Sequence, residues 1–265
     1  MTMKRRQFLT GSVAAAAAAM VRGAGAQASA KGAKEFYQLR RYQLKTGPQV
    51  KLTEDYFGVL IPALNKLGMS PVGAFRLTIG PDTPAYYLLI PSTSVEALVT
   101  VDLRLGKDEA FVKAADAFWN APAVAPAFAR VESWLLSAFD GWPRVTPPST
   151  TVTKAKRMFQ LRTYESPSMR DHVRKVEMFH SGEFEFFKSA GAELVFFGDT
   201  LVGSHAPSLT YMLSFPDTAH LEADWSAFSS DPKWTKLKAD PRFGFEEIVS
   251  NISNLMLAPL GVSQI

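Results

Sequence analysis

The chain has 265 residues and no cysteine, which excludes disulfides, thiolate nucleophiles and cysteine metal sites. Its formal net charge is +4, but residues 1–26 contain four basic residues and no acid, so +4 minus +4 leaves zero for the rest. A neutral remainder has no electrostatic attraction for nucleic acid or for an anionic membrane, and we expect neither as a partner.

Residues 1–28 have the features of a signal peptide. The basic segment KRRQFL at residues 4–9 precedes an uncharged, alanine-rich run at 11–21, and small residues at 24–28 form A-x-A cleavage sites. The run is about half as long as the roughly 20 residues that a membrane-spanning helix needs, so we expect no stable membrane insertion. The paired arginines resemble a twin-arginine (Tat) signal, with an ordinary secretory signal as the alternative. We therefore predict export to the periplasm or the extracellular space through the Tat machinery.

The pattern over residues 34–139 predicts a first β-α-β-β-α-β unit. Its expected elements are a strand at 36–44, a helix at 48–67, strands at 72–79 and 85–91, a helix-rich region, and a strand at 130–139. Gly58 and Pro62 interrupt the helical pattern, so we expect a break or kink before Pro62.

A proline- and threonine-rich linker at residues 140–156 leads into a second unit at 157–260. Its expected elements are a strand at 158–166, a helix at 168–190 that ends at Gly191, strands at 192–198 and 209–216, a helix across 219–227, and a closing strand within 245–257. Apolar residues at steps of three and four, including Met169, Val173 and Val176, predict the buried face of the long helix, with His180 on the same stripe.

The two units share their order of elements and two sequence segments. QLRxY occurs at 38–42 and again at 160–164, and the strand YYLLIP at 86–91 is similar to TYMLSFP at 210–216. An order of β-α-β-β-α-β is the ferredoxin-like motif. The sequence therefore predicts an α+β fold made of two tandem ferredoxin-like units that arose by internal duplication.

The second unit resembles the NIPSNAP family from Phe159 to about Pro259. The resemblance rests on QLRTY at 160–164, MFHSGE at 178–183, FFG at 196–198, LTYML at 209–213, DPxW at 231–234 and SNISN at 250–254. The first unit shares only QLRxY and looks like a diverged copy. The resemblance implies a dimeric α+β barrel, in which two ferredoxin-like sheets face each other, here supplied by one chain. It implies no defined activity.

Strand alternation gives each QLRxY strand two faces. One face is apolar, and the other carries Gln38, Arg40 and Tyr42 in the first unit and Gln160, Arg162 and Tyr164 in the second. Because the helices of each unit should cover its more apolar face, we expect these six residues to line a ligand site between the two sheets. A buried arginine needs acceptors. The alternative is therefore a set of internal ion pairs with Glu132, Glu193, Glu246 or Glu247.

The second unit supplies the remaining candidates. Asn and Ser are unusual in strands, so Asn251 or Asn254 could line the same cavity, with an edge strand or a bulge as the alternative. His180 and Glu183 can meet on one helix face and are weak candidates for acid–base catalysis, against a hydrogen-bonded core histidine. Two ligands on one face are too few for a metal, and no cofactor motif is present, so we expect neither.

Three functions stay open from the sequence. The first is a small-molecule-binding protein with its ligand between the sheets. The second is a cofactor-independent oxygenase or isomerase on the same barrel. The third is a protein-interaction module with a solid core and no ligand cavity. A homo-oligomer is compatible with all three.

Overall fold

The computed structural model describes residues 33–265, apart from the side chains of Phe245 and Glu246. The predicted signal peptide, residues 1–28, lies outside the described residues, and the prediction of Tat export lies there with it.

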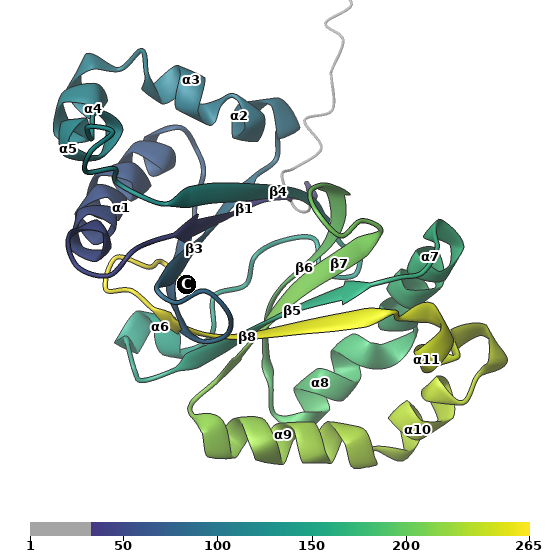
Figure 1. Ribbon diagram of the computed structural model, residues 1–265. Helices are drawn as coiled ribbons and strands as arrows, with labels where there is room; N and C mark the ends of the chain where they lie inside the picture. Colours follow the sequence, from purple (N-terminus) through teal and green to yellow (C-terminus); the bar gives the residue numbers. More distant parts are fainter. Residues whose placement is uncertain (1–32) are drawn as a thin grey trace, which may run out of the picture. The chain divides into compact units, whose positions relative to one another are not determined.

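The first half has the predicted order of elements (Figure 1). Its strands are β1 (Phe36–Gln43), β2 (Gly73–Ile79), β3 (Ala85–Ser92) and β4 (Arg130–Ala138), and its helices are α1 (Pro48–Lys66), α2 (Val95–Val99), α3 (Val101–Leu105), α4 (Glu109–Ala114) and α5 (Asp116–Trp119). The helix-rich region before β4 is thus four short helices, and the side chains of Ser94 and Asp108 cap the first turns of α2 and α4.

The second half repeats this order after the short helix α6 (Thr150–Thr153) in the linker. Its strands are β5 (Met158–Glu165), β6 (Glu193–Val202), β7 (Ser208–Phe215) and β8 (Asn251–Pro259). Its helical elements are α7 (Met169–Met178), the π-helical turn η1 (Phe179–Glu183), α8 (Phe184–Ala190), α9 (Thr218–Ser230), α10 (Pro232–Lys238), the 3₁₀ turn η2 (Pro241–Phe243) and α11 (Phe245–Ile248). The last strand therefore begins later than expected, because α11 occupies the start of segment 245–257.

Two predictions about helices were wrong. Helix α1 runs through Pro62 without a break. Proline removes one backbone hydrogen bond, but the helix packs a continuous apolar face, including the fully buried Phe57 and Leu60, against the sheet. In α7, the expected core residues Met169 and Val173 are 68% and 62% exposed. The helix instead buries the face that carries His172 and Lys175, because each of these two polar groups has an acidic partner.

The eight strands close into one barrel in the order β1-β3-β2-β8-β5-β7-β6-β4. Each half contributes four adjacent antiparallel strands, and the halves join where β2 pairs with β8 and where β4 pairs with β6. Gly198 lies opposite Ala138 at the second junction, where a Cβ would come within 2.9 Å of the Leu136 Cβ. Figure 1 shows α1 to α5 on the outside of the first-half strands and α7 to α11 on the outside of the second-half strands.

The barrel interior is lined by the opposite strand face from the one we predicted. Tyr37 and Leu39 from β1 and Phe159 and Leu161 from β5 belong to one buried cluster inside the barrel. The residues Gln38, Arg40, Tyr42, Gln160, Arg162 and Tyr164 therefore lie on the outer faces, under the helices of their own halves. The physical reason is that the continuous wall of the closed barrel shields the space inside it from water along most of its length. The more apolar face of each strand therefore turns inward. The helix layers supply polar partners for the other face, such as Asp102 for Arg40 and Trp225 for Gln160.

The sequence similarity between β3 and β7 is offset by one residue from their equivalent positions in the barrel. Leu39 pairs with Leu89, and Leu161 pairs with Met212, so Tyr87 is equivalent to Thr210 and not to Tyr211. Tyr87 points into the barrel, whereas Tyr211 lies under the helices. A shift of one residue moves a side chain to the other face of a strand.

One end of the barrel is filled. Val145 from the linker and Ile265 are both buried in the interior cluster, and Ile265 is 0% exposed. The Ile265 carbonyl oxygen accepts a hydrogen bond from Arg157 at 2.9 Å. The other end, where β1 and β5 finish, contains the cavity described below.

Candidate functional site

Arg40 lies between β1 and the first-half helices, where it is 5% exposed. Its Nη1 donates to the Asp102 carboxylate of α3 at 3.0 Å. Its Nε and Nη2 both donate to the side-chain amide oxygen of Gln38, at 3.0 and 2.8 Å. The ion pair with an acid was expected, but the acid is Asp102 and not Glu132. Burial raises the pKa of the neighbouring Tyr42, while the Arg40 charge acts in the opposite direction.

Arg162 occupies the equivalent position in the second half and is stabilised differently. Its guanidinium carbon lies 4.4 Å from the ring centroid of Trp225 and 5.3 Å from that of Tyr164. Among the described side chains, no carboxylate lies within ion-pair distance of it. Gln160 accepts from Trp225 Nε1 at 2.8 Å and donates to Asn254 at 3.2 Å, which fixes the indole over the guanidinium. Stacking of a guanidinium on an aromatic ring thus replaces the predicted carboxylate.

Lys175 and Glu183 form a fully buried ion pair beneath α7 and η1, with exposed side-chain fractions of 0% and 2%. Burial lowers the pKa of Lys175 and raises the pKa of Glu183, and each partner's charge opposes the shift of the other. Phe179, Tyr164 and Trp234 surround the ammonium group. Glu183 therefore does not meet His180, and it faces the interior of the second-half helix layer.

His180 has both ring nitrogens engaged with the backbone. Nδ1 donates to the Val176 carbonyl at 2.8 Å, and Nε2 accepts from the Gly141 N–H at 3.0 Å, a pattern that requires the neutral tautomer with its proton on Nδ1. The ring joins the interdomain linker to the long helix. Its geometry is that of a structural histidine, exposed on the surface rather than buried in the core.

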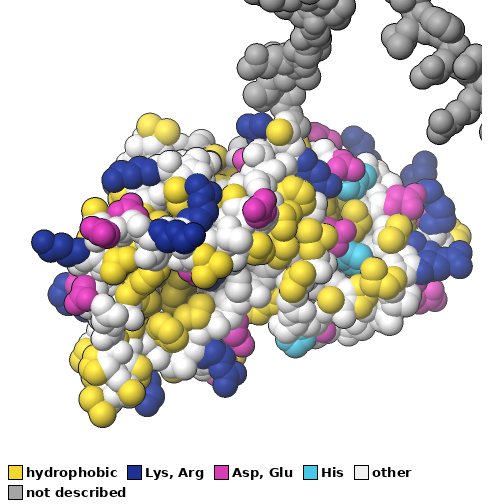
Figure 2. Space-filling view, turned by 90° about the horizontal axis from the view of Figure 1, so that it is seen from above, with side chains coloured by type: hydrophobic (Ala, Val, Ile, Leu, Met, Phe, Trp, Pro, Cys, Tyr) yellow, Lys and Arg dark blue, Asp and Glu magenta, His cyan; other side chains and the backbone are white. Residues whose placement is uncertain are grey.

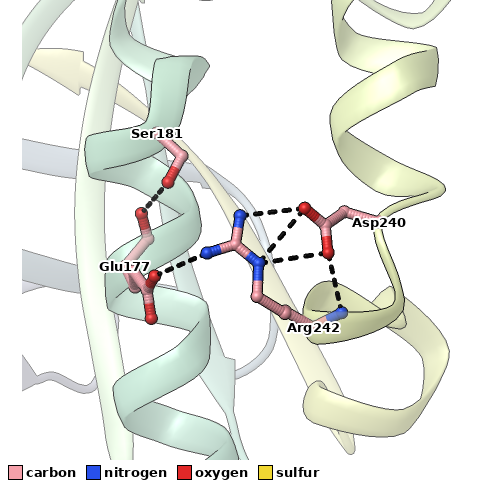
Figure 3. Close-up of polar contacts among 4 residues, drawn as sticks. All are labelled: Glu177, Ser181, Asp240 and Arg242. Atoms are coloured by element: carbon pink, nitrogen blue, oxygen red, sulfur yellow. Dashed lines mark hydrogen bonds and ion pairs between the residues drawn. The ribbon is translucent and has the colours of Figure 1, made fainter.

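A second set of contacts joins α7 to the turn η2 (Figure 3). Arg242 reaches Glu177 at 3.3 Å and Asp240 at 2.8 Å, while the Ser181 hydroxyl donates to the Glu177 carbonyl at 2.9 Å. These charges are exposed, so the pairs orient the helix and add little stability. Glu177 is thereby paired with Arg242. Among the side chains that the structure describes, no group of three or more His, Asp or Glu is placed to hold a metal.

A cavity of about 240 Å³ opens at the unfilled end of the barrel. Its apolar floor consists of Leu39, Tyr87, Trp134, Leu161 and Leu255, and its polar rim consists of Arg41, Thr163, Glu165, Ser204, His205, Ser208, Thr210 and Ser253. We call this space the mouth cavity. It lies between the two sheets, as predicted for a ligand, but none of the six predicted arginine-face residues lines it.

The rim, taken together with two acids that contact Arg41 from outside the cavity lining, carries more negative than positive charge. Arg41 Nη2 lies 2.6 Å from Asp82 and its Nη1 lies 3.1 Å from Glu132. Burial disfavours the charge of Arg41, but its hydrogen bond to Asp82 and the charges of the nearby acids raise its pKa. Glu165 adds a third carboxylate, so three acids oppose one guanidinium. Burial raises the pKa of Tyr87 to about 12, so its hydroxyl stays protonated.

Glu165 is the centre of the polar contacts on one side of the rim. Its Oε1 accepts from Asn251 Nδ2 at 2.8 Å and lies 3.6 Å from His205 Nδ1. Thr163 and Thr210 share a hydrogen bond of 2.9 Å across the β5–β7 pair. Of the two predicted asparagines, Asn251 thus belongs to the edge of the mouth cavity, and Asn254 lies under the helices with Gln160.

The sequence analysis did not predict Arg41, Glu165 and Trp134 as cavity residues. The sequence does contain a signal for Arg41. The first QLRxY copy has two adjacent arginines, and adjacent residues of a strand point to opposite faces. One arginine of the pair therefore had to face the barrel interior. Glu165 follows the second copy directly and shares the inward face of Thr163.

The fold and the cavity define an α+β protein in which two ferredoxin-like halves of one chain close a dimeric α+β barrel. Residues 159–264, which form most of the second half of the barrel, match the NIPSNAP family model. No curated protein matches the chain.

Solved structures of similar length share the whole barrel. A candidate monooxygenase from Lactobacillus acidophilus NCFM superposes with a TM-score of 0.54 at 9% identity, over 85% of this chain and 94% of that one. A candidate monooxygenase from Fusobacterium nucleatum has a TM-score of 0.54 at 11% identity, over 86% and 93% of the two chains. A NIPSNAP-like domain protein from Burkholderia xenovorans matches 40% of this chain at 11% identity with a TM-score of 0.36. Identities this low establish the fold alone.

No helix among the described residues is long and apolar enough to cross a bilayer.

Proposed function

We propose that the protein binds a small neutral or cationic molecule in the mouth cavity. One observation carries the proposal: an apolar floor, with Trp134 and Tyr87, lies below a rim that is rich in hydrogen-bond acceptors. The rim carboxylate Glu165 is unmatched in charge, because the rim guanidinium Arg41 is already paired with Asp82 and Glu132 outside the cavity lining. Ligand pockets combine a mostly apolar lining with a few placed polar groups.

The charge balance narrows the ligand class. Both carboxylates at Arg41 already neutralise it, so an anionic ligand would meet Glu165 without a compensating cation. A ligand with an amine or several hydroxyl donors would instead bond to Glu165 and the threonine hydroxyls. The volume of about 240 Å³ lies below the ~300–1,000 Å³ of sites for drug-sized molecules, so the ligand has few heavy atoms.

Native mass spectrometry of the full chain, purified from its own host, tests this proposal. We expect a retained mass that is lost when Ser253→Leu fills the cavity from β8. Ser250→Leu is the matched control, since Ser250 is exposed and does not line the cavity. Equal retention in both variants would contradict binding at the mouth.

An enzyme on the same scaffold is the second candidate, and the contact between His205 and Glu165 favours it. A carboxylate within 3.6 Å of His205 Nδ1 can orient the imidazole for proton transfer at the rim. Two of the full-length structural neighbours are named as candidate monooxygenases. An oxygenase would convert the retained molecule in air to a product of increased mass, whereas an isomerase would change its chromatographic retention at constant mass, and His205→Gln would slow either conversion. A ligand unchanged in both mass and retention over time would leave binding alone.

A further inference from the structure

The helix-covered faces of the two halves provide an internal comparison. Arg40 and Arg162 occupy the same position in the duplicated unit, because β1 pairs with β3 in the register in which β5 pairs with β7. In the second half, helix α9 places the Trp225 indole over the Arg162 guanidinium at 4.4 Å. The chain itself therefore shows what kind of group stabilises this arginine.

The first half has no such ring. Among the described residues no aromatic side chain lies over Arg40, and the region between β3 and β4 is divided into the short helices α2 to α5 instead of one long α9. A groove of about 320 Å³ remains beside the arginine, with Tyr42, Tyr56, Phe118, Trp119 and Phe128 along its length. In Figure 2, hydrophobic side chains gather around a hollow on the side that carries the first-half helices. We call this space the first-half groove.

The groove has an aromatic wall and one polar end. Tyr56 and Phe118 stack at 3.9 Å, and Phe128, at 36% exposure, continues the wall towards solvent. At the polar end, Arg40 is covered but Asp102 remains 55% exposed, so its carboxylate can accept a hydrogen bond from an incoming molecule. Since Asp102 and Arg40 neutralise each other, the groove favours a ligand without net charge.

We propose that the first-half groove binds a small planar aromatic molecule that carries one N–H or O–H donor. Its ring packs against the wall of Tyr56, Phe118 and Phe128, and its donor bonds to Asp102 beside Arg40. Aromatic rings pair favourably in offset-stacked or edge-to-face arrangements. This site is separate from the mouth cavity, because Arg40 faces the helices and Arg41 faces the barrel interior.

Indole is the direct probe, because it copies the Trp225 side chain. Saturation-transfer NMR and calorimetry on the full chain should show one indole per chain. Phe128→Ala removes a half-exposed wall residue and should raise the Kd about tenfold. The mouth-filling variant Ser253→Leu should leave the Kd unchanged, so failure at the mouth and failure in the groove are distinguishable.

Trp225→Ala provides a gain-of-binding test. Removal of the indole over Arg162 should create a second groove and raise the stoichiometry from one indole to two, with circular dichroism to confirm that the variant is folded. Absence of indole binding up to ~1 mM would overturn the proposal. So would binding that Phe128→Ala leaves unchanged or that Ser253→Leu abolishes. If Trp225→Ala does not fold, the Phe128→Ala and Ser253→Leu pair still decides the question.

Discussion

Removal of one partner of the buried Lys175–Glu183 pair should destabilise the protein in a pH-dependent way. In Glu183→Gln the Lys175 ammonium keeps its full burial and the repulsion of the Arg162 charge, but loses the attraction of the Glu183 carboxylate. Removal of one partner of a buried ion pair costs ~3–5 kcal/mol.

Deprotonation of Lys175 sets an upper limit on that cost. A lysine that is neutral when folded and charged when unfolded costs ~1.36 kcal/mol for each pH unit below the ordinary lysine pKa of ~10.4, or ~4.6 kcal/mol at pH 7. In that state the unfolded chain binds one more proton than the folded chain, so the free energy of unfolding rises with pH. We therefore expect the penalty of Glu183→Gln to shrink by up to ~1.4 kcal/mol per pH unit between pH 7 and 9.

Urea unfolding followed by circular dichroism between pH 7 and 9 measures this penalty against the wild type. Glu185→Gln on α8 is the matched control, because its pair with Lys188 is exposed and should contribute ~0–1 kcal/mol without a pH slope. The double variant Lys175→Met/Glu183→Leu should be close to the wild type or more stable. A Glu183→Gln penalty that does not change with pH would refute the reasoning, as would a double variant less stable than Glu183→Gln.

Three further predictions follow from other features. Tyr87→Phe should leave stability at pH 7 nearly unchanged and protect against alkaline unfolding. Because the pKa of Tyr87 is about 12 in the folded protein and ~10 in the unfolded chain, the wild type should lose ~2.7 kcal/mol of unfolding free energy between pH 10 and 12 that the variant keeps, which alkaline urea titrations would show. Gly191→Ala should cost ~1–3 kcal/mol in thermal melts, because Gly191 ends α8 at φ 108° and a Cβ would meet the Asp224 carboxylate at 2.8 Å; an unchanged melting temperature would contradict this. The double substitution Arg5→Lys/Arg6→Lys should abolish export if the signal is of the Tat type, as measured by fractionation of the cells. Export that persists in the double variant would indicate an ordinary secretory signal.

The element order could be predicted from sequence, but the assignment of strand faces could not. Alternation correctly separated Leu161 from Arg162, because that separation is local. Which of the two faces turns inward depends on closure of the barrel through the β2–β8 and β4–β6 pairs, which join distant segments. The assumption that helices cover the more apolar face failed, because the barrel interior is more completely enclosed than the helix layers.

The candidate site was likewise predicted only in part. A cavity between the sheets was expected, but the residues expected to line it were taken from the strand faces that turn away from the barrel interior. The pair of Lys175 and Glu183 had no sequence signal, since the two are eight residues apart and regular helical pairs are three or four apart. Trp225 as the partner of Arg162 was equally hidden, because Gln160 positions it from another part of the chain.

The covalent joining of the two halves has an evolutionary consequence. A barrel assembled from two identical chains carries every substitution twice, so a change that opens one helix layer also opens the other. In this chain the second half has a dense aromatic layer around Lys175 and Glu183, whereas the first half has short helices and an open groove. Duplication within one gene thus lets one half preserve the stability of the barrel while the other half is at liberty to change its ligand.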